Sequence, residues 1–194
     1  MRGHDGYSLM EVTFVAGFIA TAAAMAIPQM LVGLDDLRTL GAVRYIAARL
    51  QQTRMEAIVR AADTALRFTA TGGSVGYTVY VDGNRNGVRT RDIQRGLDRE
   101  IQGQERLSDQ FPGVDFGAAA DLPAVEGGSR PPAGDPIRAG SSDMITFTPL
   151  GTSTPGSLYI RGRRSAQYAI RVFGETGKTR ILKFNPRGRQ WTPL

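Results

Sequence analysis

The sequence predicts an α+β fold in which one long N-terminal helix, first transmembrane and then amphipathic, packs on antiparallel β-strands. Changes in the hydrophobic pattern predict it. No charge stands between Glu11 and Asp35, a stretch long enough to cross a bilayer as a helix. After Asp35, apolar residues recur every three or four positions as far as about Ala62. Beyond Ala62 they alternate with polar residues, which is typical of half-buried strands.

Val12–Leu34 forms the apolar part of the helix and predicts a membrane span. A secretory signal peptide is the alternative for such a segment. That alternative needs a basic cluster before the apolar block, whereas here Glu11 stands directly before it. The segment therefore has the build of an anchor that stays on the protein.

Glu11 needs a partner or a function, because a carboxylate within the bilayer costs about 2.5–3.5 kcal/mol. If the chain is cut after Gly6, Tyr7 gains a free α-amine four residues before Glu11. The amine of one subunit can then pair with the carboxylate of its neighbour as helices pack side by side. The alternative is an interfacial Glu11 that touches only headgroups.

The string Gly6-Tyr7-Ser8-Leu9-Met10-Glu11-Val12, followed by an apolar helix, resembles the N-terminal signal of type IV pilins and pseudopilins. The resemblance implies a type IV pilin-like fold and removal of the leader, residues 1–6, by a prepilin peptidase. Cleavage falls between Gly6 and Tyr7, with N-methylation of Tyr7, and Glu11 serves in assembly. It also implies a single-pass protein of the bacterial inner membrane, with a transmembrane helix over 7–34 and its C-terminal domain in the periplasm. Tyr7 stands where the family usually has Phe, and Pro28 stands where many pilins have proline.

The remaining chain is expected to hold the amphipathic part of the helix over 35–62 and a β-rich domain over 63–194. Gly72-Gly73 predicts a hairpin turn between two alternating runs. Residues 117–142 are rich in Gly, Pro and Ala, which predicts a long mobile loop. The expected strands are centred on Leu66–Phe68, Val75–Val81, Glu105–Phe111, Met144–Thr148, Leu158–Arg161, Tyr168–Phe173 and Thr179–Phe184.

The domain resembles the GspH/FimT branch of this superfamily. The order and spacing of several strings carry the resemblance: Leu50–Ala57, Val79–Gly87, Ile145–Gly151, Ala169–Val172 and Thr176–Lys178. It implies a long helix packed on two small antiparallel sheets. It also implies a minor position in a pilus or pseudopilus, with other pseudopilins or minor pilins as partners.

Catalysis is not expected from the composition. The chain has no cysteine, and its one histidine, His4, lies in the expected leader. Ser-His and Cys-His nucleophiles and the usual zinc sites are therefore not expected in the mature protein. Carboxylate-only catalysis is the remaining enzymatic possibility, and no cofactor is expected.

Gly174–Thr179 contains Gly-Lys-Thr and superficially resembles a phosphate-binding loop. That motif needs a glycine at position 172, where this chain has Val172. Predicted strands flank the segment on both sides, so no helix N-terminus is available for a phosphate. A hairpin turn is the better interpretation.

Asp82, Asn84 and Asn86 alternate as oxygen ligands do at the start of a calcium loop, with Gly87 sixth. The twelfth position is Ile93 instead of glutamate, and the neighbouring arginines would repel a cation. We therefore expect a plain turn and keep calcium as a weak alternative.

The C-terminal region from Ser157 onward carries nine arginines or lysines against Glu175 alone. Such a region can contact DNA, anionic lipid or an acidic partner, or simply form a solvated face. The candidate contact residues are Lys178, Arg180, Arg187 and Arg189. The leading interpretation is a minor pseudopilin of a type II secretion system, acting at the pseudopilus tip in protein export. The alternative is a FimT-like minor type IV pilin that binds DNA for uptake.

Overall fold

The computed structural model describes residues 8–125, 132 and 134–194. Within these residues the helices are α1 (Leu9–Arg60), α2 (Thr90–Gln94) and α3 (Leu107–Gln110). The strands are β1 (Thr64–Thr71), β2 (Ser74–Val81), β3 (Arg99–Arg106), β4 (Asp115–Phe116), β5 (Ile137–Ala139), β6 (Met144–Phe147), β7 (Gly156–Arg161), β8 (Gln167–Val172), β9 (Thr179–Asn185) and β10 (Gln190–Pro193).

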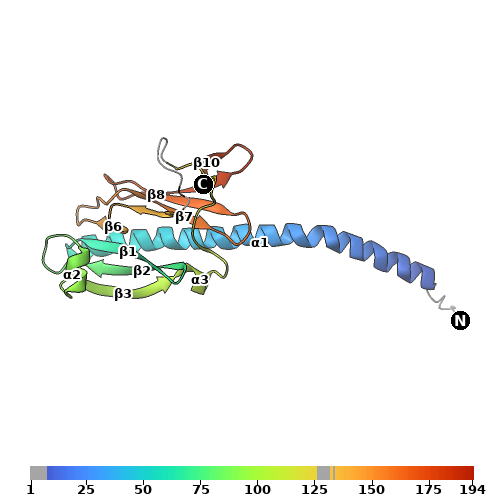
Figure 1. Cartoon of the computed structure of the whole chain (residues 1–194), viewed down its shortest axis with the longest axis horizontal. Coiled ribbons are helices and arrows are strands. Elements are labelled where there is room, and N and C mark those ends of the chain that lie inside the picture. The colour runs from blue at the N-terminus through green and yellow to red at the C-terminus, as the bar shows by residue number, and fades with distance from the viewer. Residues whose placement is uncertain (1–7, 126–131, 133) are drawn as a thin grey trace.

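The helix α1 consists of two parts that differ in burial. Its 52 residues run without interruption through Pro28, and Asp35 is the first buried residue. The part before Asp35 projects from the domain with a gentle curve (Figure 1). It is long and apolar enough to span a membrane, and none of its apolar window is buried. The part after Asp35 lies against the strands.

The helix ends at Ala61, which adopts a left-handed conformation with φ 49°. Its N–H and that of Ala62 donate to the last carbonyls of the helix, at Ile58 and Ala57. This cap closes α1 and turns the chain directly into β1.

The first sheet has the order β3-β2-β1-β6 and is antiparallel throughout. A tight turn at Gly72 and Gly73 joins β1 to β2, and both glycines have positive φ, 62° and 84°. A two-residue turn of this kind requires that conformation, which glycine adopts at least cost. The hairpin expected from the sequence is confirmed.

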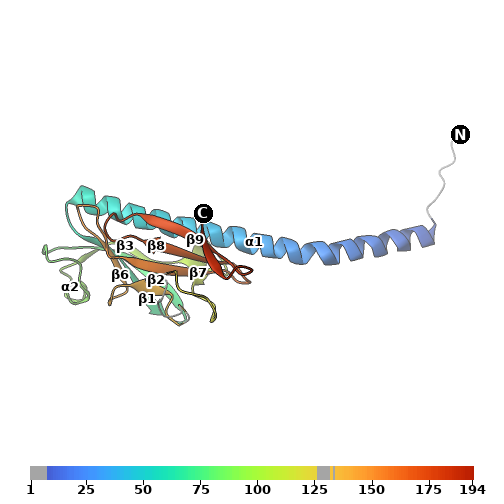
Figure 2. The same cartoon turned by 90° about the horizontal axis from the view of Figure 1, so that it is seen from above.

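The second sheet has the order β10-β9-β8-β7-β4, and β5 also pairs with β7. Its pairs are antiparallel as well. The two sheets lie on either side of the helix axis in Figure 1 and together beneath the helix in Figure 2. The expected α+β fold, one long helix on antiparallel sheets, is confirmed.

The core forms where both sheets meet one face of α1. Ala42, Val43, Ile46 and Leu50 of the helix are fully buried. They pack with residues of both sheets, among them Leu66, Ile145, Leu158 and Ile170. Each fully buried Leu or Ile contributes about 1.5–3 kcal/mol by burial, so the second part of α1 is integral to the domain.

Two expectations for the strands need correction. The strand expected over Glu105–Phe111 ends at Arg106, because the chain turns there into α3 to bury Leu107. The strand itself, β3, begins earlier, at Arg99, and alternates poorly because it is an edge strand with little buried surface. The expected loop 117–142 contains β5, whose Ile137 and Ala139 are buried beside β7.

Candidate functional site

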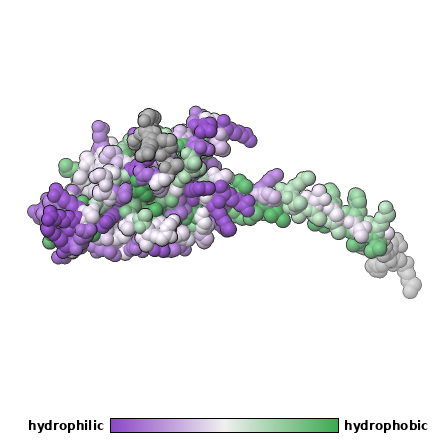
Figure 3. All heavy atoms as spheres, viewed as in Figure 1, coloured by the Kyte–Doolittle hydropathy of each residue, from purple (hydrophilic) through white to green (hydrophobic). Residues whose placement is uncertain are grey.

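The exposed part of α1 is the first candidate surface. Large apolar side chains from Leu9 to Leu34 are exposed all around it, and Glu11 is exposed in its first turn. The helix is coloured as hydrophobic along this length in Figure 3, whereas the domain surface is largely hydrophilic. Gly6 and Tyr7 lie outside the described residues.

The hydroxyls on this exposed part already have partners. Thr13 donates to the Met10 carbonyl at 2.9 Å, and Thr21 donates to the Gly17 carbonyl at 2.8 Å. Hydroxyls that bond back to the preceding turn leave no donor unsatisfied in an apolar surrounding. Glu11 is the one ionisable side chain of the described helix before Asp35, and it is the polar group there that still needs a partner.

Asp35 fastens the helix to the loop after β7. Its carboxylate accepts the backbone N–H groups of Arg163 at 2.9 Å, Arg164 at 3.0 Å and Ser165 at 3.4 Å. Gly162 permits this approach, since a Cβ there would lie 2.4 Å from the Thr39 hydroxyl oxygen. A carboxylate that collects several amides makes strong, charge-assisted hydrogen bonds.

Asp36 fastens the same point of the helix to β8 and β9. It accepts the Tyr168 hydroxyl at 2.9 Å and the Lys183 ammonium at 2.8 Å. The hydrogen bond to Asp36 raises the pKa of Lys183, and burial together with Asp36 raises the pKa of Tyr168. The first two charges after the apolar stretch thus fix the domain at the point where α1 leaves it.

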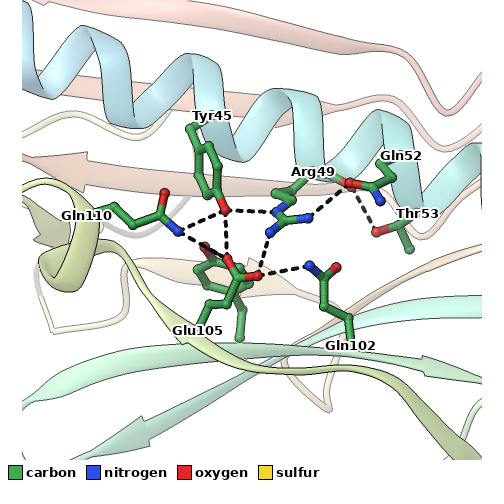
Figure 4. Close-up of polar contacts among 8 residues, drawn as sticks. Tyr45, Arg49, Gln52, Thr53, Gln102, Glu105 and Gln110 are labelled. Carbon is green, nitrogen blue, oxygen red and sulfur yellow. Dashed lines mark hydrogen bonds and ion pairs between the residues drawn. The ribbon is translucent and has the colours of Figure 1, made fainter.

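A polar cluster joins α1 to the first sheet (Figure 4). The Glu105 carboxylate accepts the hydroxyls of Tyr45 at 2.7 Å and Tyr77 at 3.0 Å, and it forms an ion pair with Arg49. Gln102 donates to it at 2.8 Å. Little in the sequence indicates this cluster, except that Tyr45 and Arg49 share one helix face four residues apart.

The pKa shifts of this cluster indicate a structural role. Burial alone would raise the pKa of Glu105, but hydrogen bonds from Tyr45, Arg49 and Tyr77 outweigh it and lower that pKa. Burial and the bond to Glu105 raise the pKa of Tyr77 far above its usual range. Glu105 is thus held ionised, and it serves to tie the helix to the sheet.

The loop of Asp82, Asn84 and Asn86 is organised by its own hydrogen bonds. Asp82 accepts the N–H groups of Asn84, Arg85 and Gly87 at 2.7–2.9 Å. The amide nitrogens of Asn84 and Asn86 point to Asp92. The described residues hold no group of three or more His, Cys, Asp or Glu side chains suited to a metal ion. Both carboxylate oxygens of Asp82, the first ligand proposed for calcium, therefore already accept hydrogen bonds from the loop itself.

Gly174–Thr179 forms the turn between β8 and β9. The Phe173 N–H donates to the Lys178 carbonyl at 2.9 Å, and the Gly177 N–H donates to the Phe173 carbonyl at 2.8 Å. Antiparallel strands flank the turn on both sides. The hairpin interpretation is confirmed, and the arrangement is not that of a phosphate-binding loop.

The four candidate contact cations are split into two pairs. Lys178 and Arg180 lie at the start of β9, while Arg187 and Arg189 follow its end. The seven residues of β9 separate the pairs by roughly 20 Å at 3.3 Å per residue. All four are exposed, and Arg189 donates to the Asp121 carbonyl at 3.0 Å. They do not form one continuous patch.

Comparison with known proteins identifies the family to which the chain belongs. The family model for the type II transport protein GspH matches residues 42–177, more than half of the chain. The chain belongs to the GspH family. The resemblance to the GspH/FimT branch is thereby confirmed, and the family description favours secretion over the FimT-like alternative.

Among solved structures, the minor pseudopilin EPSH from the type II secretion system of Vibrio cholerae is similar to this GspH-family chain. The identity is 15%, the alignment covers 82% of this chain and 94% of that chain, and the TM-score is 0.39. None of the curated proteins matches the sequence. The assignment rests on the family model, which describes a transport component and no enzyme.

Proposed function

We propose that this chain is a minor pseudopilin of a type II secretion system, one that works by assembly and not by catalysis. The observation that carries the proposal is the form of α1 in a GspH-family chain. Its apolar part is exposed from Leu9 to Leu34, with Glu11 at its start, and it continues unbroken into the core. Such a helix needs a membrane or neighbouring helices to cover it.

In the proposed function, a prepilin peptidase removes residues 1–6 and leaves Tyr7 as a methylated N-terminus. The domain lies in the periplasm while the helix is held in the inner membrane. On assembly, the helix packs among those of other pseudopilins, and the Tyr7 amine pairs with Glu11 of a neighbour. The domain then takes its place near the pseudopilus tip and supports protein export.

The N-terminal steps can be tested by intact-mass analysis of protein extracted from membranes. Loss of Met1–Gly6 together with one added methyl group is expected. The same protein expressed without a prepilin peptidase should keep its full mass. A mature N-terminus elsewhere, or equal masses in both strains, would contradict the proposed processing.

A further inference from the structure

We propose that the junction between α1 and the domain holds a binding site for the phosphate headgroup of an anionic phospholipid. The proposal rests on the membrane anchorage proposed above, and it adds a specific class of ligand at the edge of the membrane. A cavity of about 290 Å³ lies at this junction. Its lining residues are Leu31, Leu34, Asp35, Arg38, Pro112, Arg163 and Arg164.

The cavity has one wall from the helix and one from the loops. Leu34 and Asp35 both stand three or four residues after Leu31 and three or four before Arg38, so all four lie on one side of α1. Pro112 and the pair Arg163–Arg164 form the opposite wall. The lining thus combines three arginines with two leucines.

The arginines are available for an anion. Arg38, Arg163 and Arg164 are exposed, and within the described ranges their side chains form no ion pair or hydrogen bond. Asp35, the one acid in the lining, already directs its carboxylate at the amides of Arg163, Arg164 and Ser165. Guanidinium groups bind phosphate oxygens in pairs, which makes arginine the residue suited to this ligand.

The backbone of two of the arginines is also held in place. Asp35 fixes the backbone of Arg163 and Arg164 against the helix. The stem of Arg163 lies over Gly113, where an added Cβ would be 3.2 Å from the Cβ of Arg163. A site that is ordered before it binds loses less entropy when the ligand arrives.

The position of the cavity relative to the membrane favours a lipid over a soluble phosphate as the ligand. The charge-free stretch of α1 spans residues 12–34, about 35 Å of helix at 1.5 Å per residue, against about 30 Å of hydrocarbon. Arg38 follows about one turn after its end, at the level of the headgroups. Figure 3 shows the hydrophilic surface starting where this apolar length ends. An acyl chain can then lie along Leu31 and Leu34 while the phosphate meets the arginines.

The test uses the full chain in detergent micelles and native mass spectrometry, with added phosphatidylglycerol, phosphatidylcholine or inorganic phosphate. Phosphatidylglycerol should bind at least tenfold more tightly than phosphatidylcholine, and inorganic phosphate should not compete at millimolar concentration. A basic residue near an anionic surface contributes about fivefold. Replacing Arg38, Arg163 and Arg164 by Ala should therefore lower the affinity for phosphatidylglycerol about 100-fold.

A matched control replaces Arg91, Arg95 and Arg99, three exposed arginines at or beside α2, at the other end of the domain (Figure 1). It removes the same charge and should leave lipid affinity unchanged. Replacing the arginines at positions 38, 163 and 164 by Lys keeps the charge but loses the paired guanidinium contacts, so the affinity should fall between those of the wild type and the alanine variant, and this comparison remains informative even if the alanine variant folds poorly.

Equal lipid affinity in the wild type and the alanine variant would overturn the proposal, as would equal affinity for the two lipids or effective competition by phosphate. Flotation with phosphatidylcholine vesicles reports the anchor separately. Failure to float with these vesicles would contradict the proposed membrane anchorage, whereas flotation without lipid preference would remove the headgroup site alone.

Discussion

At the scale of single residues, the close approach of the loop after β7 to α1 depends on Gly162. A Cβ at this position would lie 2.4 Å from Thr39 Oγ1 and 2.8 Å from Asp35 Oδ2. Gly162→Ala should therefore push the loop away and lower the free energy of unfolding by about 1–3 kcal/mol. Urea unfolding of the full chain in detergent micelles would measure this. Gly33→Ala is the control, because its added Cβ meets no atom within 4 Å. A similar loss in both variants would contradict the account.

Glu105 is the second residue whose replacement is informative. Its pKa is lowered, on balance, by hydrogen bonds from Tyr45, Arg49 and Tyr77, against the effect of burial. The stabilisation is therefore present above the ordinary carboxyl pKa and lost as pH falls through the lower, folded-state pKa. Glu105→Gln should lower the free energy of unfolding by about 1–3 kcal/mol at pH 7.

The difference between Glu105→Gln and the wild type should begin to shrink below about pH 4, where the carboxyl becomes protonated in the unfolded chain, and should vanish as pH falls through the lower pKa of the folded chain. Unfolding measured at pH 7 and at pH 3 would check this, with the exposed Glu100→Gln as control. A difference that does not change with pH would show that the charge of Glu105 does not contribute.

At the scale of elements, Asp35 and Asp36 stabilise the domain by joining the start of the buried part of α1 to the second sheet. Asp35 holds three backbone amides, and Asp36 holds Tyr168 and Lys183. A chain starting at Leu34 keeps these contacts, whereas one starting at Leu37 loses them. Both chains should be soluble and folded. The longer chain should have a free energy of unfolding about 2–4 kcal/mol higher, because hydrogen bonds to charged groups contribute about 1.5–3 kcal/mol each, less the entropy cost of ordering the extra residues. Equal midpoints of thermal unfolding would contradict this.

The elements also show what the sequence could predict. The charge-free stretch, the helical period after Asp35 and the Gly72-Gly73 turn were enough for the long helix and the first hairpin, because each is a local pattern. The strand β3 was placed too late, since its residues are mostly half-exposed or exposed at a sheet edge and alternate weakly. The short strands β5 and β10 lack any period that could reveal them.

The contacts around the helix depend on long-range pairing and could not be found locally. Arg49 and Glu105 are 56 residues apart, and Asp35 and Arg163 are 128 apart. Asp35 and Asp36 were recognised as the end of the apolar stretch, but nothing beside them in the sequence predicts the loop that they bind. The family resemblance supplied the second sheet, which periodicity alone did not.

At the scale of the whole molecule, the four candidate DNA contact residues lie in two separate pairs. Lys178 and Arg180 are separated from Arg187 and Arg189 by the length of β9. Affinity for duplex DNA comes largely from phosphate contacts and falls steeply with salt, and each pair of cations offers only about two such contacts. We therefore expect the full chain in detergent not to retard a DNA duplex at about 150 mM salt. Retardation that disappears when all four are replaced by Ala would contradict this.

We propose that the chain assembles through its N-terminal helix, with Glu11 as the polar contact. Removing a carboxylate from an apolar surrounding favours insertion by about 2.5–3.5 kcal/mol, so Glu11→Ala should reach the membrane at least as well as the wild type. Without the carboxylate, the variant should fail to cross-link to neighbouring pseudopilins. The exposed Glu100→Ala, changed in the domain, serves as the control.

The most direct measurement is secretion by cells whose only copy of this protein carries Glu11→Ala. We expect a normal amount of the variant in the membrane fraction, loss of the exported protein from the medium, and normal secretion with Glu100→Ala. Normal secretion and cross-linking by Glu11→Ala would contradict the proposal.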